Sequence, residues 1–326
     1  MAQFGYTLSS EEHEPLPLVR LAGEAEGVGF DFAMISDHFH PWIDRQGQSP
    51  FVWAVIGGIA QATERIAIGT GVTCPTTRIH PAIVAQAAAT ASSMLPGRFL
   101  LGVGSGENLN EHILGDRWPE TPVRQERLEE AIEVIRALWE GSLTSHHGRH
   151  YTVENARIYT LPESPPPILV AAAGPRSLEL AGRVGDGLVA LSPEREIIER
   201  FEEAGGEGKP RYGQLHVCVA ASEADARSTA CEYWPNAGVP GDLNSELALP
   251  AHFEAATGTV REDDVAASVV CGPEADRHVE AVLEFVEAGY DHVYVHQIGP
   301  DQDALFDLYG SEVLPELARA AERAAV

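Results

Sequence analysis

Hydrophobic residues in this chain gather in short runs that alternate with longer stretches of helical periodicity. The short runs are rich in Val, Ile and aromatic residues, and residues 66–68 and 293–295 are almost entirely apolar, which is typical of strands covered on both faces. Within 122–139 the apolar residues recur at intervals of one and three residues, which indicates a helix with one buried face. The predicted strands cover residues 4–8, 32–36, 66–71, 99–103, 168–172, 187–191, 215–220 and 292–296.

The alternation of strands and helices predicts βα units around a parallel sheet, which can be an open doubly wound sheet or a closed barrel. A Rossmann sheet needs a GxGxxG turn after its first strand, but residues 6–10 contain no glycine, and the turn at 102–106 lacks the third glycine. The sequence therefore favours a (β/α)8 TIM barrel as a single domain over 1–326. Insertions are expected at about 140–167 and 234–273, and helices at 17–27, at 122–139, after an N-cap at Ser222 and at about 304–324.

Charge narrows the possible partners of the protein. Asp and Glu number 49 against 22 Lys and Arg, which gives a formal net charge of −27, and Lys209 is the only lysine. Such a surface repels nucleic acid and anionic membranes, so we expect a small-molecule substrate as the partner. The chain shows no signal-peptide pattern and no apolar run of about 18 residues, and its four cysteines form no CxxC pair. These features predict a cytoplasmic protein with reduced thiols, and no metal-ligand spacing is recognised.

An acidic, lysine-poor surface suits a salt-rich cytoplasm, because counterions screen the repulsion between its carboxylates. A genome of high GC content would also exchange Lys for Arg, so the halophile interpretation has an alternative. We expect the melting temperature to rise between low and molar KCl. Thermal unfolding followed by circular dichroism tests this, and a flat melting temperature across that range would remove the halophile hypothesis.

Residues that follow the strands of a TIM barrel face its active site, because all the strands end at one rim. Here the second strand is followed by Asp37, His38 and Trp42, and the fourth by a glycine-rich turn that ends in Glu107. A group that titrates near neutrality beside a carboxyl whose pKa burial can raise is suited to proton transfer during hydride chemistry. Each of these residues alone is more often a loop residue with satisfied hydrogen bonds or a packing residue. The interpretation therefore depends on their meeting at one rim.

Three segments carry a resemblance to a known family. Residues 36–39, 69–72 and 102–111, continued by 171–175 and 181–187, resemble the luciferase-like superfamily, and most closely its F420-dependent glucose-6-phosphate dehydrogenase group. The resemblance covers residue 5 to about 191 and returns at 289–299. It implies a luciferase-like barrel, a bound F420 deazaflavin, and a homodimer paired through the barrel helices.

The resemblance also implies roles for individual residues. His38, Glu107 and Trp42 would be catalytic, with His38 taking a proton from a substrate hydroxyl and Glu107 protonating the reduced ring, although these two steps could be exchanged. Glu11 and Trp234 would flank the substrate, Gly71–Val72 would form a non-prolyl cis peptide, and a turn beginning at Ala173 would hold the cofactor phosphate. The implied cofactor-binding residues are Asp37, Gly71, Val72, Thr73, Cys74, Gly106, Asn110, Ala173 and Gly174.

The chain departs from the glucose-6-phosphate enzymes in one respect. Those relatives hold the sugar phosphate with lysines, whereas this chain has only Lys209 and places Glu194 where a cation is expected. An alcohol or another sugar therefore fits as well as a sugar phosphate, and the direction of hydride transfer stays open. Two further functions remain as alternatives: an FMN-dependent luciferase-like monooxygenase, and a non-catalytic member that keeps the fold.

Overall fold

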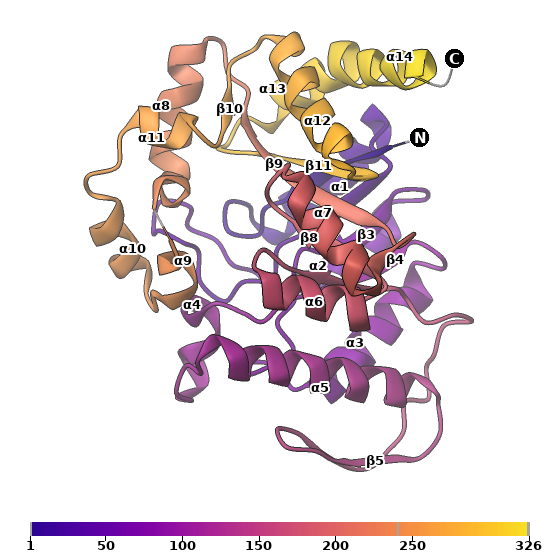
Figure 1. Ribbon diagram of the computed structural model, residues 1–326. Coiled ribbons are helices and arrows are strands. Elements are labelled where there is room, and N and C mark those ends of the chain that lie inside the picture. Colours follow the sequence, from indigo (N-terminus) through magenta and orange to yellow (C-terminus); the bar gives the residue numbers. More distant parts are fainter. Residues whose placement is uncertain (1, 240, 325–326) are drawn as a thin grey trace.

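The computed structural model describes residues 2–239 and 241–324. Eight parallel strands close into a barrel, because β8 and β11 both pair with β9 (Figure 1). The short β10 (Val270–Cys271) is added beside the end of β9. The barrel strands, in order around the ring, are β11 (His292–Gln297), β1 (Gln3–Leu8), β2 (Phe32–Ile35), β3 (Ala67–Thr70), β4 (Phe99–Val103), β7 (Ile168–Ala171), β8 (Gly187–Ala190) and β9 (Arg211–Cys218).

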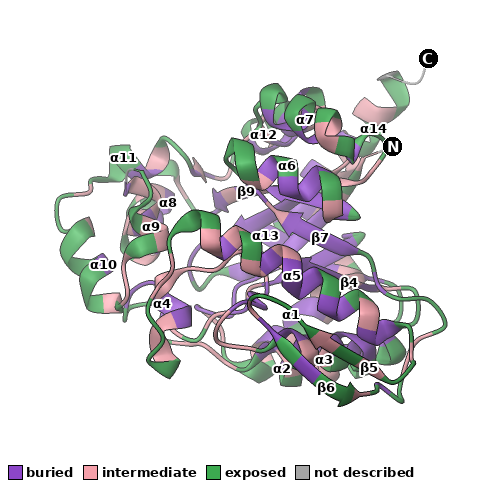
Figure 2. Ribbon diagram, turned by 60° about the horizontal axis from the view of Figure 1, so that its bottom comes forward, coloured by how far each residue is buried: buried purple, intermediate pink, exposed green. Residues whose placement is uncertain are grey.

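Helices surround the barrel and bury their apolar stripes against it, while their outward faces stay exposed (Figure 2). Among the described residues no helix combines the length and the hydrophobicity needed to cross a membrane. The helices beside the strands are α1 (Pro15–Val28), α2 (Val52–Ala62), α3 (Pro81–Met94), α5 (Thr121–Trp139), α6 (Pro175–Val184), α7 (Arg195–Phe201), α8 (Glu223–Tyr233), α12 (Ala275–Ala288), α13 (Gln302–Leu308) and α14 (Leu314–Ala324).

The inside of the barrel is filled by side chains and is not a channel. Alternate residues of each strand point inward, and Phe32, Tyr212 and Tyr294 meet there in one apolar cluster. Gly5 makes room for this cluster, since a Cβ at Gly5 would lie 2.5 Å from the Phe32 ring. Buried polar side chains such as Ser9, Glu11 and Asp37 lie beyond this cluster, after the carboxyl ends of the strands.

All eight predicted strands are present, which confirms the (β/α)8 barrel. The seventh begins at Arg211, four residues before the predicted start at 215, because residues 211–213 pair in parallel register with residues 188–190 of β8. Ser222 caps α8 as expected, with its hydroxyl accepting from Asp225 N. The last predicted helix is instead divided into α13 and α14 by a π-helical turn, Tyr309–Val313.

The two long connections contain structure of their own. The segment after α5 forms an antiparallel hairpin of β5 (Thr144–His147) and β6 (Thr152–Ala156). The segment after α8 carries three short helices near the barrel mouth. The three helices are α9 (Leu243–Glu246), α10 (Pro250–Thr257) and α11 (Glu262–Ala266), and α4 (Asn108–Glu111) lies beside α9.

Candidate active site

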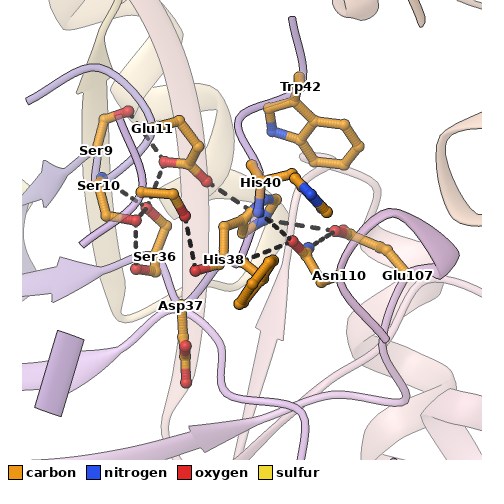
Figure 3. Close-up of polar contacts among 12 residues, drawn as sticks. Ser9, Ser10, Glu11, Ser36, Asp37, His38, His40, Trp42, Glu107 and Asn110 are labelled. Carbon is orange, nitrogen blue, oxygen red and sulfur yellow. Dashed lines mark hydrogen bonds and ion pairs between the residues drawn. The ribbon is translucent and has the colours of Figure 1, made fainter. Parts of the chain in front are cut away.

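The ends of β1, β2 and β4 bring an imidazole and two carboxyl groups together at the barrel rim (Figure 3). His38 Nε2 lies 3.3 Å from Glu11 Oε1 and 3.4 Å from Glu107 Oε2. The Glu11 side chain is buried at 2% exposure, whereas that of Glu107 is 33% exposed and faces the mouth. The predicted meeting of His38 and Glu107 at one rim is therefore present in the structure.

The chain holds His38 in one orientation. His38 Nδ1 lies 3.2 Å from the carbonyl oxygen of His40, which favours a proton on Nδ1 and directs Nε2 toward the carboxyl groups. The Asn110 side chain joins this loop to Glu107: its Oδ1 accepts from the backbone N–H of Phe39 and His40, and its Nδ2 donates to Glu107 Oε2 at 3.1 Å. Asn110 was expected to contact a cofactor, and in the structure it fixes the distance between the imidazole and the acid.

Glu11 contacts His38 from below the rim. Ser36 Oγ donates to Glu11 Oε2 at 2.5 Å, and Ser9 Oγ donates to the same oxygen at 3.2 Å. These hydroxyl groups replace the water that a buried carboxylate loses. The contact between Glu11 and substrate that the family resemblance implies stays a prediction, because the contacts of this side chain are with His38 and the two serines.

The side chains of Glu11, His38 and Glu107 shift one another's pKa values. Burial disfavours the imidazolium form of His38, but Glu11 and then Glu107 outweigh burial and raise the pKa of His38. Burial alone would raise the pKa of Glu11, yet His38 and the Ser36 hydroxyl lower it. For Glu107 burial dominates and raises the pKa, and His38 offsets only part of that effect. Glu11 is therefore the permanent carboxylate, while His38 and Glu107 share the exchangeable proton.

Asp37 lies behind this group in a buried salt-bridge network. Thr73 Oγ1 and Arg78 Nη2 donate to its two carboxylate oxygens at 2.7 and 2.8 Å. The backbone N–H of Arg78 donates to Glu111 Oε2 at 2.6 Å. Any bond from Asp37 to a cofactor would be additional to these contacts, and the cofactor role of Asp37 stays a prediction.

Replacing Arg78 with Lys should lower the free energy of unfolding by about 2 kcal/mol, because an ammonium group cannot reproduce the forked contacts of a buried guanidinium. The Arg78 side chain is 7% exposed, so water cannot supply the missing partners. Chemical denaturation measures the change. Arg65→Lys is the matched control, since the Arg65 side chain is 71% exposed and its pair with Glu26 spans 3.8 Å. Equal stability of the two variants would contradict a supporting role for Arg78.

The turns after β3 and β4 pack backbone against backbone. The expected cis peptide between Gly71 and Val72 is present. A Cβ at Gly102 would lie 2.0 Å from the Thr70 carbonyl oxygen, so only glycine fits there. Gly106 has φ +85° and would place a Cβ 2.5 Å from Cys74 Sγ, so glycine is required at this position as well.

Two other predicted cofactor-binding positions differ in their solvent exposure. The Cys74 thiol is buried beside Thr76, and burial raises its pKa well above the ordinary value, so it is not a thiolate. Ala173 and Gly174 are exposed where α6 begins, and their N–H groups donate to Ser177 Oγ. A phosphate at this turn would have to compete with that hydroxyl for both donors.

Two tryptophans belong to one apolar wall beside the rim. The Trp42 ring lies 5.0 Å from the His38 ring and 5.2 Å from Phe253, and Trp234 belongs to the same cluster. Gln46 ties the two loops together, since its Oε1 accepts from Trp42 N and its Nε2 donates to the carbonyl oxygen of Tyr233. Both predicted tryptophans are thus on the same side of His38.

Sequence reasoning did not single out Ser36, Gln46 or Arg78. Ser36 directly precedes the Asp37–His38 pair, so its place at the strand end was a usable signal. For Gln46 and Arg78 no such signal exists, because their partners are set by how separate loops pack.

Comparison with known proteins agrees with this geometry. The model of the family described as luciferase-like monooxygenase matches residues 1–292. A protein of Beutenbergia cavernae named F420-dependent glucose-6-phosphate dehydrogenase is 36% identical over 99% of both chains. Its namesake from Microbacterium testaceum (strain StLB037) is 35% identical over 97% of this chain and 98% of its own length.

A solved structure gives the same picture. It is described as an F420-dependent secondary alcohol dehydrogenase in complex with an F420-acetone adduct, and it superposes with a TM-score of 0.90. The two sequences are 31% identical, and the match covers 97% of this chain and 99% of that one. The family match and these full-length similarities show that the chain belongs to the luciferase-like family.

Proposed function

We propose that this protein is an F420-dependent oxidoreductase that moves a hydride between the deazaflavin and a CH–OH substrate. The group formed by Glu11, His38 and Glu107 carries the proposal, because it places a base, its counter-charge and an acid within 3.4 Å contacts at one rim. The relatives named for F420-dependent dehydrogenation support the same cofactor and reaction class.

The rim offers a surface suited to a flat ring. Gly102, Gly104 and Gly106 line the end of β4 with backbone, and a Cβ at Gly104 would lie 2.8 Å from Val72 Cγ2. These glycines hold the turns after β3 and β4 close together, since no Cβ lies between them. The turn at Gly71–Val72 and the end of β4 would hold the ring, with Glu107 and Asn110 near its edge.

The residues of this chain handle the protons. When bound, F420 would supply the ring that accepts a hydride from the carbon bearing the substrate hydroxyl. His38 Nε2 takes the hydroxyl proton, and the resulting imidazolium is stabilised by the Glu11 carboxylate. Glu107, whose pKa is raised by burial, holds a proton on its carboxyl group at the same rim. Trp42 and Trp234 exclude water from the substrate side.

A sugar phosphate is poorly supported as the substrate. Lys209 Nζ donates to the carbonyl oxygen of Gly182, and Lys209 precedes β9, so the only lysine lies at the end of the barrel opposite the rim. Arg195 donates to the carbonyl oxygen of Glu287, and Arg277 pairs with Glu223. We therefore propose an uncharged alcohol or sugar as the substrate class.

The test adds F420 and FMN separately to the purified protein and follows tryptophan quenching, then screens alcohols and sugars for bleaching of oxidised F420. We expect F420 to bind more tightly than FMN, and an uncharged alcohol to bleach it. Tight binding of FMN with substrate oxygenation in air would instead establish the monooxygenase alternative. Binding of F420 without bleaching by any alcohol would overturn the proposed reaction.

We also propose a homodimer formed through α2 and α3. Between these helices lies an apolar groove that includes Phe51, Ile83 and Met94, whose side chains are 59%, 57% and 39% exposed. Contiguous exposed apolar surface of this kind indicates a protein–protein contact.

The four free cysteines of the protein support the cytoplasmic location expected from the sequence.

Ile83→Glu should convert the dimer to a monomer, because it places a charge in the centre of the proposed contact. Size-exclusion chromatography with light scattering measures the mass. Leu143→Glu is the matched control, since Leu143 is 67% exposed but belongs to the connection after α5. A dimer that survives Ile83→Glu would place the contact elsewhere, and a monomeric unchanged protein would refute the homodimer.

A further inference from the structure

A second group of polar side chains lies at the same rim and is not used by the proton chemistry above. His216 on β9 and His296 on β11 are register partners on adjacent strands, and their Nδ1 atoms are 3.0 Å apart. His296 Nε2 lies 3.0 Å from Glu12 Oε2, and Glu12 Oε1 accepts from the backbone N–H of Gly299 at 2.8 Å. The result is a chain from carboxylate to imidazole to imidazole.

Strand alternation places both histidines inside the barrel. His216 lies on the same face of β9 as Tyr212, and His296 on the same face of β11 as Tyr294, and both tyrosines belong to the cluster that fills the barrel. His296 is the last inward residue of β11, and only Cys218 follows His216 on the inward face of β9, so the pair lies near the rim. The side chains of Glu12 and His296 are both 2% exposed, whereas His216 is partly exposed.

One turn connects this chain to the catalytic group. Glu11 and Glu12 are neighbours after β1, and they contact His38 and His296 respectively. The Trp234 ring lies 4.4 Å from the His296 ring and 5.7 Å from the His216 ring, and Trp234 shares an apolar cluster with Trp42. His216 and His38 are therefore on one rim and beside one apolar wall.

We propose that His216 is a specificity-determining residue that hydrogen-bonds an uncharged oxygen of the substrate through its Nε2 atom, oriented by His296 and Glu12. This inference rests on the proposed function, since it names the substrate class of the same site. His296 occupies Nδ1 of His216, so Nε2 is the nitrogen left for a ligand. His296 is a positioning residue in this arrangement, because Glu12 and His216 occupy both of its nitrogens.

The charge state of His216 selects the kind of ligand. Burial, and then the neighbouring His296, lowers the pKa of His216 to about 3, so the imidazole is neutral at physiological pH. A neutral imidazole presents either an N–H or a lone pair at Nε2, and a hydroxyl group can pair with either. A phosphate would gain no opposite charge here and would face the carboxylates of Glu11 and Glu12, so the site favours an uncharged alcohol or sugar over its phosphate ester.

Calorimetric titration of the full chain, with and without F420, against propan-2-ol, glucose and glucose 6-phosphate tests the inference. The unchanged protein should bind an uncharged ligand more tightly than glucose 6-phosphate. His216→Phe, which keeps the ring but removes its nitrogens, should weaken the uncharged ligand roughly fivefold, as expected for one lost neutral hydrogen bond. His216→Gln should restore part of the affinity because its amide can both donate and accept.

The matched control is His292→Gln, at the opposite end of β11, where the His292 ring stacks on Tyr212 at 4.1 Å. This variant should bind all three ligands like the unchanged protein. In turnover, His216→Phe should raise KM about fivefold and leave kcat within about twofold, a split that a purely structural role would not produce.

Three results would overturn the role of His216: unchanged affinity in a folded His216→Phe variant, preference of the unchanged protein for glucose 6-phosphate, or no binding of either uncharged ligand. If uncharged ligands bind in the expected His216-dependent way but no alcohol bleaches F420, the proposed reaction fails while the assignment of His216 stands. The two proposals are therefore distinguished by one set of titrations.

Discussion

Replacing His38 with Ala should abolish turnover and leave the affinity for F420 nearly unchanged. His38 Nε2 is the only nitrogen of the imidazole that faces both carboxyl groups, since Nδ1 is directed to the His40 carbonyl oxygen. Without it the imidazole proposed to accept the hydroxyl proton is lost. A general base of this kind contributes 10²–10⁴-fold, so we expect kcat to fall on the order of 10³-fold. Steady-state bleaching of F420 measures kcat, and tryptophan quenching measures cofactor affinity.

The matched control for this variant is His147→Ala. The His147 side chain is 65% exposed on the β5–β6 hairpin, where it pairs with Glu154. The hairpin follows α5 and contributes no residue to the group around His38. This variant should retain full turnover. Full turnover in a folded His38→Ala protein would remove His38 from the mechanism, and loss of F420 binding would show that its role is to hold the cofactor.

The sequence predicted those parts of the site that follow from strand ends. His38 and Glu107 come directly after strands whose apolar residues reveal them, and a closed barrel brings all strand ends to one rim. Their convergence was therefore predictable once the barrel was favoured over an open sheet. Gly71 and Gly106 were named from the family resemblance, and in the structure a Cβ at Gly106 would lie 2.5 Å from Cys74 Sγ.

The remaining contacts depend on register and packing. His216 and His296 are 80 residues apart, and they meet because β9 and β11 are adjacent in the barrel although β10 intervenes in sequence. Glu12 contacts His296 from the turn after the first strand, 284 residues away in sequence. No local sequence pattern identifies Arg78 either, because its ion pairs with the buried side chains of Asp37 and Glu111 depend on how separate loops pack. Single-sequence periodicity carries no information on such pairs.

Glu11 has a supporting contact that the resemblance did not name. The resemblance places Glu11 beside the substrate, which stays a prediction, and in the structure its side chain is 2% exposed and accepts hydrogen bonds from Ser9 and Ser36. A carboxylate held in this way favours the protonated form of His38, so Glu11 can affect catalysis without touching substrate. The strength of His38 as a base is then set in part by Glu11, which itself follows the end of β1.

Glu107→Gln should lower kcat for alcohol oxidation on the order of 10²-fold and change the pH profile in two ways. In the unchanged protein the reactive form has a neutral His38 and a protonated Glu107, so activity is lost at low pH as His38 gains a proton and at high pH as Glu107 loses its own. Glutamine cannot titrate, so the falling limb due to Glu107 should disappear. Because the ionised Glu107 carboxylate raises the pKa of His38, its removal should lower that pKa and shift the limb on which His38 loses its proton.

The profile of kcat/KM against pH, measured by F420 bleaching, checks both changes. Glu126→Gln is the matched control, since the Glu126 side chain is 47% exposed on α5 and pairs with Arg149 and His150. It should leave both limbs in place. An unchanged falling limb in Glu107→Gln would assign that limb to another group. A rising limb that does not move would mean that the 3.4 Å contact between Glu107 and His38 carries no electrostatic coupling, and the shared-proton arrangement of the site would be wrong.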